Sequence, residues 1–530
     1  MLAPPSEPPV AMPWSPGYGR RAPLTYAAGD PRKQQASIVP AMPFESVRDY
    51  VAALERRGRL LRLPAMDQDR YEASAFAYRL IERFGIEQAP AFLIERLKIG
   101  GRWRDGPVVA NAYGRWPDEA LLFGVDQVTD DPQQMYRAVL AELESRLDAA
   151  GNWRRIAPVA VADPRAAPCK EVVLTGDQVD LESFAWLQNN PADGGRYVNM
   201  GSVFIQDPEL GRNVGTYRCQ VKGPRRMGVN PEPGQHGWRI LMGMKARGDR
   251  SAKVAVAVAP DPMTFCASST KMAGYLEDEL EFAGGLRGQP LPVVKCETSD
   301  IMVPASSEFV IEGEVSLTEF EEEGPFGEMY GYLGPKKAEN FVMQISAITH
   351  RRQPWVLNSF TGLTCDLPRA PQVAASFFQY RKLIPSLTGL NSPRGATGVI
   401  VISIDKKFPG EGIAAGQCLA ANAALHKVVI VVDKDLDILD PSQVLHALGA
   451  RWQPTASLLI PRTQMMMPDP SRPVRGLSSK IVIDATRQWP GEGGPKSWAP
   501  LNRDLLLQGA PGAFDLVDSR WAEYLQGWKP

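Results

Sequence analysis

A succession of strand-like segments between residues 170 and about 355 most restricts how this chain can fold. Each segment alternates apolar and polar residues or stays apolar for several residues, and turn-forming residues separate the segments. Strands that follow one another in this way favour a closed or split antiparallel barrel. The segments are KEVVLTG (170–176), VNMGSVFIQD (198–207), VGTYRCQVKG (214–223), KVAVAVAP (253–260), EFVIEGEV (308–315) and NFVMQISAITH (340–350).

The regions on either side of the barrel segments mix helix and strand patterns. In FESVRDYVAALERRG (44–58), Ser46 can cap a helix with one apolar face, and Gly58 can end it. Beyond Arg381 the patterns alternate regularly, which is typical of a layered α/β domain. The alternating segments are GVIVISID (398–405), IAAGQCLAANAALH (413–426), KVVIVVDKD (427–435), SQVLHALG (442–449) and KIVIDAT (480–486).

These patterns predict a mixed α/β and β (α+β) protein of several domains, as the length of 530 residues also favours. The segment PWVLNSFTG (354–362) is expected to return to the N-terminal lobe. The predicted boundaries are a flexible Pro-rich tail (1–43), an N-terminal α/β lobe (44–168, rejoined by 356–378), a barrel domain (169–355), a C-terminal α/β domain (379–512) and a second tail (513–530).

Composition excludes several classes of protein. A net charge of −1 argues against binding nucleic acid, and no apolar run is long enough to cross a bilayer. Six widely spaced cysteines without a CxxC pair indicate a reduced, cytoplasmic protein. Four histidines without HExxH give little support to a zinc hydrolase. Neither GxGxxG after a strand, nor a P-loop, nor GxSxG is present.

An acidic stretch, EEEGPFGEMYGY (321–332), carries four glutamates on a stiff Gly-Pro-Phe-Gly frame. No Lys or Arg lies between residues 301 and 335, so the stretch is either a solvated turn or an acid/base pair that faces a cation from elsewhere. Arg218 is a candidate cation, because it projects from the polar face of the strand-like NVGTYRCQ (213–220). Taken alone, an arginine in this position is more often an ordinary solvent-facing side chain.

Two further segments could bind an anion together with a metal ion. Gln235 and His236 begin a predicted helix, where backbone N–H groups favour a phosphate. The hydroxyl residues 268–270 follow a buried strand and precede a predicted helix that carries Glu279. Such oxygen donors, with an occasional imidazole, suit Mg²⁺ or Mn²⁺. Each segment alone is also compatible with a structural role.

Taken in order, these motifs resemble the UbiD family of reversible decarboxylases, which use prenylated flavin mononucleotide (FMN). The similarity runs from about residue 44 to beyond residue 485. It implies a split barrel of the flavin-reductase type that binds the cofactor, and a C-terminal domain that forms homodimers or homohexamers. The matching motifs are NVGTYR (213–218), GQH (234–236), CASST (266–270), ELEFAG (279–284), EGPFGE (323–328) and HKVVIVV (426–432).

The resemblance also implies a role for each matching residue. Arg218, Glu323 and Glu328 would form the Arg-Glu-Glu catalytic network of the family. A divalent ion, Mn²⁺ or Mg²⁺, would tie the cofactor phosphate to the protein, and a K⁺ ion would lie beside the phosphate. The metal ligands would be Asn213, His236 and Glu279. The other cofactor-binding residues would be Thr216, Tyr217, Arg218, Gln235, Ser268, Ser269, Thr270 and Lys427.

The expected chemistry explains why a cofactor is needed. The expected substrate is an aromatic, heteroaromatic or α,β-unsaturated carboxylic acid. Loss of CO₂ from such a carbon leaves an electron pair that no side chain can delocalise, so the cofactor must accept it. In the family this occurs through a covalent flavin–substrate adduct, and a protein acid then returns a proton. We assign the acid to Glu328, kept neutral by a dry pocket, while Glu323 orients Arg218. A flavin prenyltransferase would supply the cofactor.

Alternatives to a decarboxylase stay open at this point. A physiological carboxylase, often one subunit of a larger complex, would use the same residues in the opposite direction. A binding or assembly protein would not need all six catalytic and metal positions filled. An ordinary flavin reductase would use unmodified FMN and have no role for two acids. The sequence does not identify the carboxylic acid substrate or whether it is a coenzyme A thioester.

Overall fold

The computed structural model describes residues 42, 44–364, 366–465, 469–472 and 476–527. The predicted first helix is confirmed as α1 (Val47–Arg56). It begins with a capping box, in which the Ser46 side chain accepts from the Asp49 backbone N–H and the Asp49 side chain accepts from the Ser46 backbone N–H. The predicted Pro-rich tail lies outside the described residues, apart from Met42.

The N-terminal sheet joins segments that are far apart in the sequence. Its strand order is β1-β3-β4-β17, and β2 pairs with β3. The chain returns to this sheet after the barrel, because β17 pairs in parallel with β4 through Val356↔Val108 and Leu357↔Val109. The elements of this region are β1 (Leu60–Leu63), β2 (Met66–Asp67), α2 (Glu72–Phe84), β3 (Ala91–Ile99), β4 (Arg102–Ala110), α3 (Trp116–Leu122), α4 (Pro132–Glu144) and β17 (Val356–Leu357).

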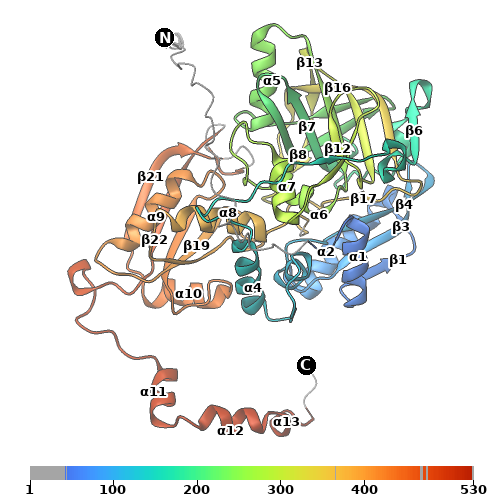
Figure 1. Cartoon of the computed structure of the whole chain (residues 1–530). Helices are drawn as coiled ribbons and strands as arrows, with labels where there is room; N and C mark the ends of the chain where they lie inside the picture. Colours follow the sequence, from blue (N-terminus) through green and yellow to red (C-terminus); the bar gives the residue numbers. More distant parts are fainter. Residues whose placement is uncertain (1–41, 43, 365, 466–468, 473–475, 528–530) are drawn as a thin grey trace, which may run out of the picture. The chain divides into compact units, whose positions relative to one another are not determined.

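Six antiparallel strands in the middle of the chain form a closed barrel (Figure 1). The order is β13-β10-β7-β8-β9-β16, and pairing between β13 and β16 closes the ring. β6 pairs with β16 outside the ring. The predicted antiparallel barrel is therefore confirmed. The strands are β6 (Val172–Thr175), β7 (Tyr197–Asp207), β8 (Gly211–Gly223), β9 (Arg226–Val229), β10 (Ser251–Val258), β13 (Phe309–Glu323) and β16 (Lys337–His350).

Three helices accompany the barrel, and two of them, α5 and α6, contact β7 and β8. α5 (His236–Arg247) and α7 (Glu279–Arg287) were predicted, and each begins at a predicted site residue. α6 (Pro262–Ser269) was not predicted. Short strands form two smaller sheets, β5 (Val159–Ala160) with β11 (Pro292–Lys295) and β12 (Met302–Pro304), and β14 (Phe326–Gly327) with β15 (Leu333–Gly334).

The C-terminal region is a layered α/β domain, as predicted. Its strand order is β18-β19-β20-β22-β21, with β19, β20 and β22 parallel and the two edge strands antiparallel. α9 contacts β20 and β22. The elements are α8 (Ala370–Arg381), β18 (Leu387–Asn391), β19 (Val399–Ile404), α9 (Glu411–Asn422), β20 (Val428–Asp433), α10 (Pro441–Ala450), β21 (Ser457–Gln464) and β22 (Leu477–Asp484).

The end of the described chain contains three short helices that the sequence analysis did not predict: α11 (Asn502–Gly509), α12 (Ala513–Ser519) and α13 (Trp521–Tyr524). None of their residues is buried. Six 3₁₀ helices complete the described elements: Gln68–Arg70, Pro164–Ala166, Pro168–Lys170, Gly176–Gln178, Leu181–Ser183 and Pro490–Glu492. Within the described ranges, no helix combines the length and the apolar character needed to span a membrane.

Candidate active site

Arg218 on β8 lies between two glutamates that follow it by 105 and 110 residues. Its Nε and Nη2 donate to the two carboxylate oxygens of Glu323, each at 2.9 Å. Its Nη1 donates to Oε1 of Glu328 at 2.5 Å. The side chains are 10%, 0% and 16% exposed, respectively. The structure therefore brings together the three predicted catalytic residues in a nearly dry place.

The turn between the two glutamates explains this geometry. β13 ends at Glu323, and the following Gly324 has a φ of 87°, in the left-handed region that favours glycine. Phe326 then lies against the Arg218 guanidinium, with Cζ 4.7 Å from the ring centroid, a cation–π distance. The Gly-Pro-Phe-Gly spacer thus directs both acids to one arginine and supplies an aromatic surface for it.

The electrostatic environments of the two glutamates differ. Burial opposes the charge on Arg218, but the hydrogen bonds and negative charges of Glu323 and Glu328 outweigh burial and raise the pKa of the guanidinium. Tyr197 donates its hydroxyl to Oε1 of Glu323 at 3.0 Å, and burial, followed by the charge of Glu323, raises the pKa of that hydroxyl. Glu323 accepts three side-chain hydrogen bonds, whereas Glu328 accepts one from Arg218.

The other two acids of the stretch lie outside this network. Glu322 is 57% exposed and pairs with Lys336 at 2.5 Å, as expected for a solvent-facing side chain. Glu321 is 25% exposed and pairs with Arg226.

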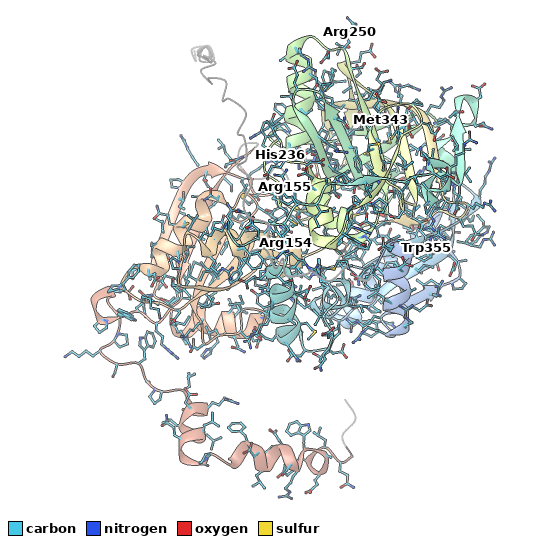
Figure 2. All side chains as sticks on the ribbon, in the orientation of Figure 1. Arg154, Arg155, His236, Arg250, Met343 and Trp355 are labelled. Atoms are coloured by element: carbon cyan, nitrogen blue, oxygen red, sulfur yellow. The ribbon has the colours of Figure 1, made fainter. Side chains whose placement is uncertain are left out.

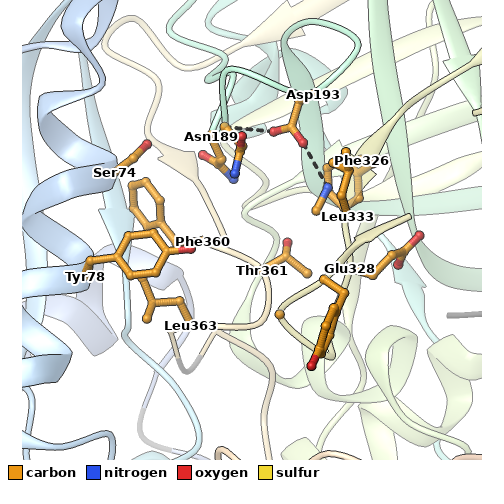
Figure 3. A pocket seen from close by; sticks show the side chains of 14 residues that line it. Ser74, Tyr78, Asn189, Asp193, Phe326, Glu328, Leu333, Phe360, Thr361 and Leu363 are labelled. Atoms are coloured by element: carbon orange, nitrogen blue, oxygen red, sulfur yellow. Dashed lines mark hydrogen bonds between the residues drawn. The ribbon is translucent and has the colours of Figure 1, made fainter. Parts of the chain in front are cut away.

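Glu328 lines a cavity whose walls come from four separate segments (Figure 3). Ser74 and Tyr78 of α2 lie on one side, and Phe326 and Glu328 lie on the other. No sequence motif indicated the wall that α2 contributes. The remaining lining residues are Asn189, Asn190, Asp193, Gly327, Gly331, Tyr332, Leu333, Phe360, Thr361 and Leu363.

Asn213, His236 and Glu279 come from β8, α5 and α7, and hydrogen bonds connect their positions. The buried Tyr217 hydroxyl accepts from Asn213 Nδ2 and from the backbone N–H of Gly237, next to His236, both at 3.3 Å. Glu279 accepts from the backbone N–H of Val214, next to Asn213, at 2.8 Å. The three predicted metal ligands therefore lie around the first residues of β8 and the starts of helices α5 and α7, and Figure 2 marks His236 at the start of α5.

The predicted phosphate-binding hydroxyls lie at the C-terminal end of α6. Ser268 Oγ is 2.8 Å from Ser202 Oγ and 3.2 Å from Thr216 Oγ1, and Ser202 and Thr216 are partners on β7 and β8. Ser269 and Thr270 donate to carbonyl groups one turn back in α6. Thr216, Ser268, Ser269 and Thr270 therefore lie close to one another. The three hydroxyl residues 268–270 do not follow strand β10 directly, because helix α6 lies between β10 and Thr270.

Two predicted cofactor-binding residues have other partners in this structure. Gln235 Oε1 accepts from the backbone N–H of Glu232 at 2.7 Å, which fixes the turn before α5. Lys427 Nζ donates to Asp469 at 2.8 Å and to Ser471 at 2.6 Å in the C-terminal domain. None of these three hydrogen bonds involves the proposed metal ligands or the hydroxyl residues 268–270.

Comparison with known proteins places these features in a family. Three family models match successive parts of the chain: the N-terminal domain of 3-octaprenyl-4-hydroxybenzoate carboxy-lyase over residues 51–138, its Rift-related domain over 160–364 and its C-terminal domain over 368–485. The chain belongs to the UbiD family. It is therefore a carboxy-lyase, and the resemblance found in the sequence is confirmed.

Individual UbiD-family relatives support this assignment over most of the chain. A phenolic acid decarboxylase from Sedimentibacter hydroxybenzoicus is 31% identical over 86% of this chain and 94% of its own length. The solved vanillic acid decarboxylase of that organism in its open form is 28% identical, with a TM-score of 0.74 over 91% of this chain and 100% of its own. An evolved dimeric form of the UbiD-class enzyme HmfF from Pelotomaculum thermopropionicum, in complex with prFMN, is 28% identical, with a TM-score of 0.70 over 89% of this chain and 98% of its own.

The donor set of the barrel site fits a divalent cation, which the UbiD resemblance implies. Burial raises the pKa of Glu279 to about 8, so an adjacent cation would compensate its charge. Burial, then Arg239 and Lys271, lower the pKa of His236, which leaves the imidazole neutral as ligation requires. Among the described residues, no group of three His, Cys, Asp or Glu side chains could bind a metal, so this set depends on the amide of Asn213.

Proposed function

We propose that this UbiD-family protein is a non-oxidative decarboxylase of an aromatic or α,β-unsaturated carboxylic acid, dependent on prenylated FMN. The observation that carries the proposal is the Arg218 guanidinium held between Glu323 and Glu328, with Glu328 at the wall of a cavity. A carboxylate-binding cation and a proton-carrying acid are the two groups that this reaction requires from the protein.

Each residue of the network has a separate task in this proposal. Arg218 binds the substrate carboxylate and stabilises negative charge as the carbon–carbon bond breaks. Glu323, through two hydrogen bonds from Arg218 and one from Tyr197, keeps the guanidinium in one orientation. Among the residues that the structure describes, Glu328 accepts a side-chain hydrogen bond from Arg218 Nη1 alone. It also lines the cavity, so it is the acid placed to carry a proton to the carbon that loses CO₂.

The cofactor side of the barrel supports the same proposal. Asn213, His236 and Glu279 would hold Mn²⁺ or Mg²⁺ against the cofactor phosphate, and Ser268 and Thr270 would lie near a K⁺ ion. When bound, prenylated FMN supplies the electron sink that the twenty side chains lack. The HmfF structure in complex with prFMN supports this choice. A flavin prenyltransferase would provide the cofactor.

The cavity and the relatives favour aromatic substrates. Phe326, Phe360 and Leu363 supply apolar walls suited to a flat ring, and the side chains of Ser74 and Asn189 lie among the lining residues. The relatives named phenolic acid decarboxylase and vanillic acid decarboxylase act on aromatic acids that carry a ring hydroxyl. We therefore propose hydroxylated aromatic acids as the first substrate class to examine.

The test is to express the chain together with a flavin prenyltransferase, determine the mass of the bound cofactor, and measure CO₂ release from vanillate and a panel of benzoates and cinnamates in deuterium oxide. We expect prenylated FMN, and deuterium at the carbon that lost CO₂. Glu328→Gln should lower kcat by about 100-fold or more, whereas Glu322→Gln in the same loop should not. Activity with unmodified FMN only, or a product without deuterium, would refute the proposal.

A further inference from the structure

A loop that contains no predicted site residue, NNPADGG (189–195), lies against the turn that carries the two catalytic acids. Its Gly194 backbone N–H donates to the Pro325 carbonyl at 2.7 Å. Its Asp193 accepts from the Gly327 backbone N–H at 2.9 Å. Both bonds end on the Gly-Pro-Phe-Gly spacer, between Glu323 and Glu328. The loop therefore makes hydrogen bonds to two of the four residues of the spacer.

Gln220 connects the same loop and the same turn. Its Nε2 donates to the Gly194 carbonyl at 2.8 Å, and its Oε1 accepts from the Gly324 backbone N–H at 3.4 Å. Gln220 lies two residues after Arg218 on β8, so both side chains project from the same face of the strand. The strand that carries the arginine thus also fixes the turn that carries its two partners.

The loop and the turn touch without room for a side chain between them. A Cβ added to Gly194 would lie 2.3 Å from the carbonyl oxygen of Gly324 and 2.6 Å from its carbonyl carbon. Both obstructing atoms belong to the backbone, so they cannot rotate away as a flexible side chain could. Glycine at position 194 is therefore required for this contact.

The Asp193 side chain is held in place within its own loop, so it can fix the position of the turn to which it bonds. It is 7% exposed, and its second oxygen accepts from the Asn190 backbone N–H at 2.9 Å within its own loop. Figure 3 shows the two hydrogen bonds of this carboxylate on opposite sides of it. No bond of Asp193 is used for binding in the function proposed above, although the residue lines the cavity beside Glu328.

We propose that Asp193, Gly194 and Gln220 form a clamp that fixes the separation and direction of Glu323 and Glu328, with Asp193 as the principal positioning residue. The role of the two acids rests on the proposed function, but the clamp itself concerns only the position of the turn. Because Glu328 receives one hydrogen bond and Glu323 three, release of the clamp should displace Glu328 first.

The experiment compares the full-length protein with Asp193→Asn and Gly194→Ala. Two controls carry the same changes elsewhere: Asp177→Asn at a fully exposed aspartate, and Gly449→Ala, where an added Cβ has nothing within 4 Å. Hydrogen–deuterium exchange of the peptide spanning 321–332 is measured in each protein as purified. Steady-state kinetics are then measured on the enzyme loaded by a co-expressed prenyltransferase, with vanillate and the acid of the panel that turns over fastest.

We expect exchange of the 321–332 peptide to increase about 10-fold in both clamp variants and to stay unchanged in both controls. We expect kcat to fall about 10- to 100-fold while KM changes less than about 3-fold, because the acid is misplaced and the binding cavity is retained. A merely structural role would instead lower thermal stability and leave kcat unaltered in the folded fraction.

Unchanged exchange in Asp193→Asn, or increased exchange with an unchanged kcat, would overturn the clamp. Failure of the proposed function gives a different result: Glu328→Gln would keep wild-type activity, or no acid of the panel would lose CO₂. In that case the exchange measurement still decides whether the loop holds the turn, because it needs neither cofactor nor substrate.

Discussion

At the scale of single residues, Glu323 and Glu328 are chemically identical and structurally different. Glu323 is fully covered and accepts from Tyr197 and twice from Arg218. Glu328 is partly exposed to the cavity and accepts once. Two carboxylates that face one arginine can therefore perform two tasks, one as a fixed counter-charge and the other as a group that exchanges a proton.

The planar guanidinium of Arg218 allows one side chain to bind both glutamates, and Arg218→Lys tests whether this geometry is needed. Lysine keeps the charge but cannot make the paired hydrogen bonds to Glu323 and a third to Glu328. We expect kcat/KM for decarboxylation to fall about 100-fold, with the fold retained by circular dichroism. Arg226→Lys is the matched control, since Arg226 is 51% exposed and pairs with Glu321 outside the network. Equal losses in both variants would contradict the assignment.

The three network residues could be predicted from the sequence, whereas their supports could not. Glu323 and Glu328 belong to one short motif with a stiff spacer, and Arg218 lies on a strand whose polar face is evident from the alternation of its residues. Asp193 and Gln220 act through backbone groups more than 100 residues away, as in the Gly324–Gln220 contact across 104 residues. Such long-range contacts leave no periodic pattern. The only local sign was the Asp-Gly-Gly run at 193–195.

At the scale of elements, the long barrel strands and the alternating C-terminal elements followed from hydrophobic periodicity. One helix that was missed, α6, has a local signal: Asp261 accepts from the backbone N–H groups of Met263 and Thr264 as the N-cap, and Pro262 takes the first helical position. The Asp261-Pro262 pair is therefore a sequence signal for the start of this helix. Two-residue strands such as β14 and β17 are too short for any period to appear, and only tertiary pairing defines them.

The acidic turn also contacts the C-terminal domain. Just after Glu328, the Met329 carbonyl accepts from Thr397 Oγ1 at 3.2 Å, and the Tyr330 hydroxyl donates to the Leu425 carbonyl at 2.9 Å. The turn is thus held on one side by the clamp and on the other by the last domain. The position of that domain is therefore coupled to the position of Glu328.

Tyr330→Phe tests this coupling by removing one hydroxyl. We expect kcat to fall about 3- to 10-fold, the loss of one hydrogen bond, with little change in the unfolding midpoint. Tyr524→Phe on the exposed α13 is the control and should behave as the wild type. Wild-type kcat in Tyr330→Phe would show that the C-terminal domain does not help to place the acid.

At the scale of the whole molecule, the C-terminal helices α11 to α13 contribute no buried residue to the described chain. Truncation after residue 499 should therefore leave the calorimetric unfolding midpoint within about 2 °C of the wild type. Truncation after Ala485 is the contrasting variant, because it removes the buried Thr486 and Gln488 and the Glu492 partner of Lys406, and should lower the midpoint.

A lowered midpoint after truncation at residue 499 would contradict this prediction. It would show that these helices pack in solution against a surface that one chain does not provide. Light scattering on the same samples would then report whether the predicted homodimer or homohexamer depends on them.

The closed ring of strands also orders events during synthesis. Residues 213 to 279, which hold the proposed metal ligands, leave the ribosome before β13, which ends at Glu323, before the turn that carries Glu328, and before β16, which closes the ring. Arg218 precedes Glu323 by 105 residues, an interval of about 5 to 20 s of translation. A nascent chain therefore contains Arg218 and the proposed metal ligands before it contains either glutamate of the network.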